Sequence, residues 1–306
     1  MAQVRNGPVV HAPGPFALVR RALALVLRPK PLFAALLAAG AALAGSPAAM
    51  AWGNQGHRIT GLFADTLLTP RIRAQILQLT GSSSLADLAT WAEDNRPGLS
   101  QLIDNSAQWH YDNRPVCDAA APVSSYCAGG NCASAALTRF ESTLADPRAS
   151  HEQRSIALRF LIHVLGDIHQ PLHVGDNGDA GGNRRNVKLA GAPPRNLHSL
   201  WDIVPLQRML EGSDEQGLVA GLREYFAADI VDWQRGSEAQ WMNESYVVAQ
   251  QHAYGALPGF QCNATPAFVT PLAEGYVREA QAQEARQLAR AGARIAETLN
   301  RLFDPK

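Results

Sequence analysis

The 306-residue sequence is poor in features that mark membrane-spanning, repeat or duplex-binding proteins. Its longest apolar run, residues 31–45, is shorter than the ~20 residues that a membrane-spanning helix needs. No internal repeat or low-complexity linker appears. Beyond residue 51 no lysine- or arginine-rich run or basic patch stands out, so strong, salt-dependent binding of duplex nucleic acid is not expected.

Residues 1–51 contain five basic residues, no acidic residue and the short apolar run. This order, ending in the small–x–small sequence Ala49-Met50-Ala51, predicts a secretory signal peptide that is cleaved after Ala51. A membrane anchor is the alternative, and the length of the run disfavours it. We therefore expect a secreted or periplasmic protein whose mature chain spans residues 52–306.

Cleavage at this point would give Trp52 a free α-amino group. Such an amine has a pKa near 8, and once deprotonated it can bind a metal together with the carbonyl oxygen of the same residue. Removal of the signal peptide would then complete a metal site.

The composition of the mature chain indicates a well-packed exported protein. It keeps 22 of the 27 basic residues and all 27 acidic ones, which gives a net charge of −5. It is long enough for one large or two small domains.

Four cysteines in an oxidising compartment predict two disulfides, for which three pairings are possible. A Cys/His zinc site is the alternative, but no C-x2-C pair is present. The cysteines are Cys117, Cys127, Cys132 and Cys262.

Apolar residues recur mainly at helical spacing, which predicts an all-α, single-domain protein. Alternation typical of a strand is confined to residues 186–190. Two long loops are expected, at 110–132, where the cysteines cluster, and at 172–197. The expected helices span residues 57–68, 70–80, 85–95, 133–144, 151–169, 197–207, 217–233, 237–254 and 271–303.

Two His/Asp pairs at i, i+4 are the strongest chemical signal. His163 and Asp167 share one face of an expected helix, and His198 and Asp202 do so on another. A single pair of this kind is more typical of a buried core histidine with its partner. Two pairs, with His173 two residues after the helix-breaking Pro171, are better explained as ligands of metal ions.

Three further motifs are ambiguous when taken alone. Trp52 and His57 flank a glycine-containing turn that can bring both to one ion. Glu93 and Arg96 offer a carboxylate and a phosphate-binding fork, or an ordinary surface ion pair. His110 lies between two aromatic residues, of which Tyr111 can stack on a base or pack in the core.

In this order the motifs resemble those of the trinuclear-zinc, single-strand-specific nucleases, the nuclease P-one/S-one family with a helical phospholipase C-like fold. The resemblance covers 52–306 and implies a zinc-dependent nuclease domain there. The motifs are WGNQGH at 52–57, TWAEDNR at 90–96, WHYDN at 109–113, FLIHVLGDIHQPLHV at 160–174, GGN at 181–183 and NLHSLWD at 196–202.

The resemblance implies three zinc ions in three ligand sets. One set would be Glu93, His110, His163 and Asp167. The second would share Asp167 with Trp52 and His57. The third would be His173, His198 and Asp202.

The resemblance also assigns other roles. It implies that Glu93 and Arg96 are catalytic, that Tyr111 and Asn183 bind the base, and that the disulfides pair Cys117 with Cys262 and Cys127 with Cys132. Glu93 departs from the family, which usually has Asp here, so Asp94 is an alternative ligand. The family often has Asp where this chain has Asn113, with Asp112 shifted by one position.

The expected activity is hydrolysis of single-stranded RNA and DNA to 5′-phosphorylated products, together with 3′-phosphatase activity on nucleotides. We expect a monomer without a stable protein partner. The alternatives are a zinc phospholipase C-type phosphodiesterase of the same fold and a non-catalytic secreted zinc-binding protein.

Overall fold

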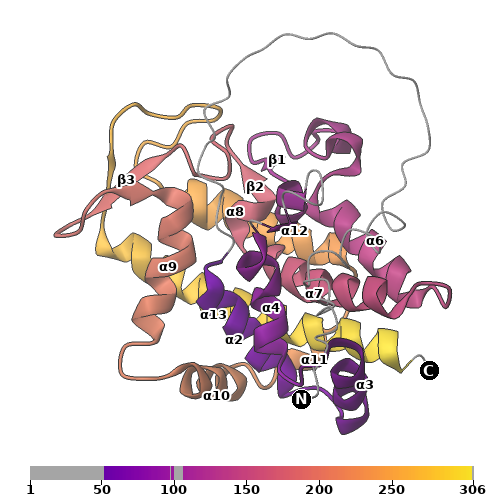
Figure 1. The fold of residues 1–306 in the computed structure, drawn as a ribbon. Coiled ribbons are helices and arrows are strands. Elements are labelled where there is room, and N and C mark those ends of the chain that lie inside the picture. Colours follow the sequence, from indigo (N-terminus) through magenta and orange to yellow (C-terminus); the bar gives the residue numbers. More distant parts are fainter. Residues whose placement is uncertain (1–51, 97, 100–105, 305–306) are drawn as a thin grey trace, which may run out of the picture.

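A computed structural model of the protein describes residues 52–96, 98–99 and 106–304 (Figure 1). The predicted signal peptide lies outside the described residues. Within them, no helix is both long and apolar enough to cross a membrane. The helices are α2 (Asn54–Asp65), α3 (Pro70–Thr80), α4 (Leu85–Asp94), α6 (Ala133–Ala145), α7 (His151–Asp167), α8 (Pro171–Val174), α9 (Leu197–Met209), α10 (Glu215–Tyr225), α11 (Ile230–Trp233), α12 (Glu238–Val248) and α13 (Glu274–Phe303).

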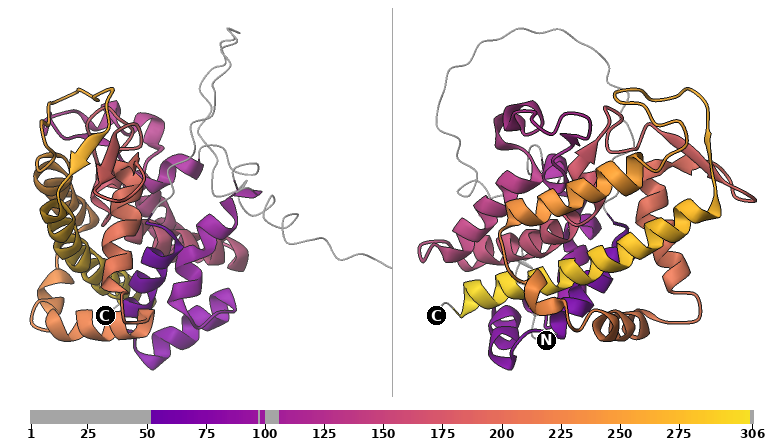
Figure 2. Two further views of the ribbon diagram at one scale, coloured as in Figure 1. Left: turned by 90° about the vertical axis from the view of Figure 1, so that its left-hand side faces the viewer. Right: turned by 180° about the vertical axis from the view of Figure 1, so that it is seen from behind.

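Helix α7 forms the centre of the molecule, and almost all of its residues from Ser155 onward are buried. Helices α4 and α6 pack against it, and α2 packs against α4. The α2–α4 crossing requires a residue without a side chain, since a Cβ atom on Gly61 would lie 2.6 Å from the backbone of Leu85. Helix α13 crosses the back of the molecule beside α12 (Figure 2, right). The all-α prediction is thus confirmed.

The ends of two helices follow from local chemistry. Ser150 begins α7 with a capping box, in which its side chain and that of Gln153 each accept a bond from the other's backbone N–H. Asn196 caps α9 through Ser199 N. Both caps precede a His/Asp pair, so they help to fix where each pair lies.

In the described part of the chain, five short strands form two small sheets. Strand β1 (Arg114–Pro115) pairs in parallel with β2 (Gly175–Asp176). Strand β3 (Asn186–Leu189) lies between β4 (Arg195–Asn196), which is antiparallel to it, and β5 (Thr270–Leu272), which is parallel. Of these strands, β3 matches the one expected from the sequence, whereas the others have only two or three residues and are too short to show an alternating pattern.

Two of the expected helices are interrupted. The helix expected over 217–233 is instead α10 and α11, because the chain turns where the ring of Phe226 packs on Trp233 at a centroid distance of 5.0 Å. The helix expected over 237–254 is α-helical only to Val248 and continues as a π-helical turn, Ala249–Tyr254. Residues 270–272 form β5 rather than the start of α13.

The expected loop 110–132 contains two short 3-10 helices, Val123–Ser125 and Ala128–Gly130, and a third, Ser106–His110, ends at its first residue. Both disulfides implied by the family resemblance are present. Cys117 pairs with Cys262 over 145 positions, and Cys127 pairs with Cys132 over five. The first joins the loop to the segment before β5, and the second closes a small turn before α6.

Candidate metal centre

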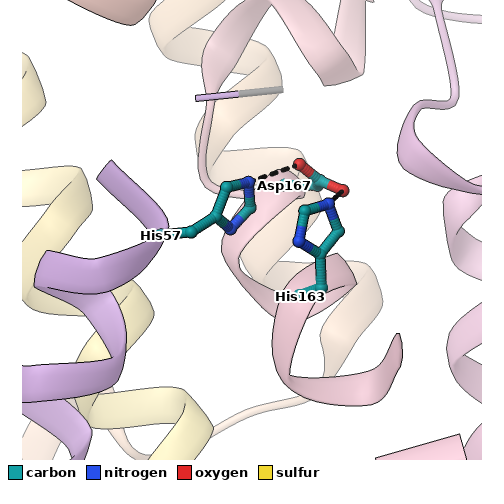
Figure 3. A group of neighbouring side chains, drawn as sticks. All are labelled: His57, His163 and Asp167. Atoms are coloured by element: carbon teal, nitrogen blue, oxygen red, sulfur yellow. Dashed lines mark ion pairs between the residues drawn. The ribbon is translucent and has the colours of Figure 1, made fainter. Parts of the chain in front are cut away.

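The carboxylate of Asp167, at the end of α7, lies between two histidines (Figure 3). Its Oδ1 is 3.3 Å from Nε2 of His57 on α2, and its Oδ2 is 3.3 Å from Nε2 of His163, one turn earlier on α7. Gly166 permits this approach, because a Cβ there would lie 2.9 Å from Nδ1 of His57. All three side chains are fully buried, and together they form the first candidate metal-binding group.

The second candidate group is Glu93, His110 and His163. Nδ1 of His110 lies 3.0 Å from Nε2 of His163 and 3.0 Å from Oδ2 of Asp167. Oε1 of Glu93 is 3.8 Å from Nδ1 of His110 and 3.9 Å from Nε2 of His163. His163 and Asp167 therefore connect this group to the first.

The third candidate group is His173, His198 and Asp202. Nε2 of His198 is 3.5 Å from Oδ2 of Asp202, and the rings of the two histidines stack at a centroid distance of 5.0 Å. Asp167 also borders this group, since its Oδ1 lies 3.4 Å from Nδ1 of His173. The structure thus brings all eight predicted His, Asp and Glu ligands into one continuous cluster.

Backbone carbonyl groups fix the tautomers of three histidines. Nδ1–H of His163 faces Ala89 O at 2.6 Å, that of His173 faces His110 O at 2.7 Å, and that of His198 faces Gly181 O at 2.7 Å. Each ring must donate from Nδ1, so Nε2 carries the lone pair. Metal-ligating histidines typically donate their second N–H in this way.

The lone pairs are buried without hydrogen-bond donors. Nε2 of His57, His173 and His198 and Oδ1 of Asp167 have no hydrogen-bond partner among the described residues. Leaving a buried acceptor unpaired is costly. Divalent cations at these positions would satisfy all four atoms, so the residues present fit a metal cluster.

Burial also keeps the histidines in the ligand form. It lowers the pKa of His163 well below its ordinary value and that of His173 to about 3. Both rings are therefore neutral near pH 7. Burial raises the pKa of Asp202 to about 6, and this effect outweighs the opposing effects of His198 and of the hydrogen bond from Gln170.

Trp52 is buried, with 1% of its surface exposed, and packs over Gly56 one residue before His57. Residue 51 lies outside the described part of the chain. The role expected for a free Trp52 amine remains a prediction.

Arg96 and Tyr111 lie beside the second group. Nη1 of Arg96 donates to Oε2 of Glu93 over 3.1 Å. The guanidinium also lies close enough to Tyr111 to affect its phenol, whose pKa burial raises on balance. Asp112 instead turns away to accept a bond from Ser134 N at the start of α6. The cation and the aromatic ring expected to contact substrate are therefore at the same side of the cluster.

Asn183 lies in the loop that supports the third group. Its Nδ2 donates to Ala180 O over 2.8 Å. The adjacent Gly181 and Gly182 pack directly on His198, since a Cβ on Gly182 would lie 3.2 Å from His198 N. The oxygen of Asn113 faces the same loop, 3.4 Å from the Cβ position of Gly181.

Sequence reasoning missed two polar residues at this cluster. Nε2 of Gln170 donates to Oδ1 of Asp202 over 2.7 Å and so orients it. Glu284 on α13 is 1% exposed, neither of its oxygens has a hydrogen-bond partner among the described residues, and it interacts with Asp202. Gln170 can be noticed as a polar residue between His169 and Pro171, whereas Glu284 resembles the exposed charges around it.

Comparisons with known proteins agree with this geometry. The model of a family described as S1/P1 Nuclease matches residues 52–304. Nuclease P1 of Penicillium citrinum is 30% identical over 200 residues, which are 60% of this chain and 72% of that protein. Endonuclease 5 of Arabidopsis thaliana is 28% identical over 290 residues, covering 84% and 92%. Nuclease S1 of Aspergillus oryzae is 30% identical over 158 residues, covering 49% and 53%.

Proposed function

Because the chain belongs to the S1/P1 nuclease family and is therefore a phosphodiester hydrolase acting on nucleic acids, we propose that it is a zinc-dependent nuclease specific for single strands. The observation that carries the proposal is the set of buried, unpartnered Nε2 and carboxylate oxygen atoms that converge at Asp167. Imidazole-rich donor sets favour zinc over magnesium or calcium, which prefer oxygen.

Three ions are proposed, one in each of the three ligand sets that the family resemblance implies. His163 has one lone pair, at Nε2, and so belongs only to the set with Glu93 and His110, although it borders both of the first two candidate groups. Bound there, they would polarise the phosphate and lower the pKa of an attacking water. The ligands would be Trp52, His57, Glu93, His110, His163, Asp167, His173, His198 and Asp202. The Trp52 contribution requires the proposed cleavage after Ala51, and with it a secreted or periplasmic location.

The remaining residues have distinct proposed roles. Glu93 orients the attacking water or takes its proton, because its carboxylate faces the shared cluster. Arg96 donates to the phosphate oxygens, where negative charge increases in the transition state. Since products would carry a 5′-phosphate, the bond that breaks joins phosphorus to the 3′-oxygen, and 3′-nucleotides should be dephosphorylated at the same centre.

Single-strand specificity rests on Tyr111, Asn183 and the net charge. Tyr111 is half-buried beside Arg96, where its ring can stack on an unpaired base. Asn183 offers an amide to a base edge. A base inside a duplex is not available for stacking, and a mature chain of net charge −5 does not favour duplex binding by charge alone.

A zinc phospholipase C-type enzyme of the same fold is the alternative. The test is to incubate the processed protein with single-stranded DNA, duplex DNA and phosphatidylcholine, each with and without EDTA. We expect rapid cleavage of the single strand, much slower cleavage of the duplex, and loss of both with EDTA. Hydrolysis of phosphatidylcholine in preference to DNA would contradict the proposal, and zinc binding without any hydrolysis would favour a storage protein.

A further inference from the structure

Strand β3 exposes one polar face beside the third candidate group. Side chains alternate strictly between exposed and buried from Arg184 to Ala190, so Arg184, Asn186 and Lys188 point outward. Val187 and Leu189 point into the core on the other face. These cations form no run in the sequence, because Arg184 and Lys188 occupy alternate positions of an extended segment.

The cations on this face lack acidic partners. Residues 180–196 contain four basic residues and no acidic one, and residues 256–273 contain no charged residue at all. Neither Arg184 nor Lys188 forms an ion pair with a described carboxylate, although Arg184 donates to Gly178 O. Elsewhere many arginines are paired, as Arg208 is with Glu274. In a mature chain of net charge −5, this is a local surplus of positive charge.

The face adjoins the candidate metal centre through two elements. Asn186 is the partner of Asn196 across the β3–β4 ladder, and Asn196 caps the helix that carries His198. At the same end of β3, the turn that precedes the strand includes Gly181, whose carbonyl accepts a hydrogen bond from His198. Figure 1 shows β3 extending from the body of the protein beside α9. A polynucleotide bound at the third candidate group would therefore extend onto this face.

An exposed aromatic residue lies at the edge of the same sheet. Strand β5 runs beside β3, with Val187 opposite Thr270. Just before β5, Phe268 is 68% exposed and Val269 39% exposed. A cationic track with an exposed aromatic ring is the combination that binds single strands without sequence preference.

We propose that the β3 face, defined as Arg184, Asn186, Lys188 and Phe268, is a binding site for the part of a single-stranded polynucleotide that extends beyond the metal centre. Arg184 and Lys188 bind backbone phosphates, and Phe268 stacks on a base. The inference deepens the proposed function and rests on it. It makes the enzyme more efficient on long strands than on dinucleotides, since a dinucleotide occupies only the metal centre.

The test compares R184Q/K188Q with the wild-type protein on two substrates, a 20-residue thymidine oligonucleotide and the dinucleotide of thymidine. Binding of the labelled oligonucleotide is also measured by fluorescence anisotropy after EDTA treatment, which prevents cleavage. We expect the Kd and KM for the oligonucleotide to rise about tenfold at low salt, with dinucleotide kinetics unchanged. Loss of two phosphate contacts should reduce the slope of log Kd against log salt by about 1.4.

The matched control is R148Q/R235Q, which makes the same change in net charge. Both arginines are exposed and pair with neighbouring aspartates away from the β3 face. This variant should bind the oligonucleotide like the wild type. An equal loss in both double variants would show a general charge effect and overturn the proposal.

F268A tests the stacking contribution separately. It should weaken binding of the thymidine oligonucleotide at least about fivefold but leave binding of an abasic oligonucleotide unchanged. The assignment would be overturned if R184Q/K188Q bound the oligonucleotide as the wild type does. It would also be overturned if R184Q/K188Q lost binding to anionic lipid vesicles but kept its binding to the oligonucleotide. If the wild type failed to cleave even the dinucleotide and the oligonucleotide, the proposed function itself would fail, which is a distinguishable result.

Discussion

Nδ2 of Asn54 donates a hydrogen bond to Oδ1 of Asp94 over 3.0 Å. This bond holds the Asp94 carboxylate at the first turn of α2, while the preceding residue, Glu93, faces His110 and His163. Two adjacent acids thus serve different purposes. The geometry favours Glu93 as the metal ligand, which the sequence left open against Asp94.

We expect E93Q and D94N to differ sharply. E93Q replaces a charged ligand by a neutral amide and should lower kcat more than about 100-fold, with loss of one of the three ions. D94N keeps a group that can bond to Asn54 and should stay within about threefold of wild-type activity. Steady-state kinetics and metal analysis of both variants check this. The reverse order of effects would make Asp94 the ligand.

Variants at Arg96 and Tyr111 should have different kinetic effects, on the chemical step and on substrate binding respectively. R96A should lower kcat about 100-fold or more, because the guanidinium meets charge that develops only in the transition state. Y111A should mainly raise KM, since stacking stabilises the ground state and the transition state alike. Kinetics on a single-stranded oligonucleotide distinguish the two. A normal kcat for R96A would show that Arg96 takes no part in the chemical step.

The sequence predicted the parts of the centre that depend on local spacing. His163 with Asp167, and His198 with Asp202, share a helix face at i, i+4, and the helices that carry them formed as expected. The register of Arg96 in the family motif favours Glu93 over Asp94, but the bond that holds Asp94 comes from Asn54, far away in sequence, and no local pattern predicts it. Glu284 was missed because its burial results from the packing of α13 against other helices. The strands β1, β2 and β5 are too short to show a pattern.

The two disulfides should contribute unequally to stability. Cys117–Cys262 closes a loop with a sequence separation of 145, whereas Cys127–Cys132 spans only five positions. Loop-closure entropy predicts losses of about 5 kcal/mol for C117S/C262S and about 2 kcal/mol for C127S/C132S. Urea unfolding measures both. A larger loss for the short loop would show that contacts within 127–132 outweigh chain entropy.

Glu284 should make the metal-free protein less stable at high pH. Burial raises the pKa of this carboxyl well above its ordinary value, with a further contribution from Asp202. The unfolded chain releases the proton near pH 4.5 while the folded protein retains it, so stability falls as pH rises above that value. E284Q is neutral at every pH, and its Tm should exceed that of the wild type by more at pH 8 than at pH 5.

The control for E284Q is E274Q, which changes an exposed carboxylate on the same helix whose ion-pair partner, Arg208, stays charged between pH 5 and pH 8. Its Tm difference from the wild type should not grow between pH 5 and pH 8 in the way expected for E284Q. A constant Tm difference for E284Q would mean that Glu284 is ionised in the folded protein.

We propose that the buried donors around Asp167 and His198 hold three zinc ions once Trp52 is the N-terminal residue. Native mass spectrometry of a chain that begins at Trp52, purified with zinc present, measures this directly. The account predicts three zinc ions per chain, and fewer when a verified extra residue precedes Trp52, because the α-amino ligand is then blocked. One ion or none in the chain that begins at Trp52 would contradict it.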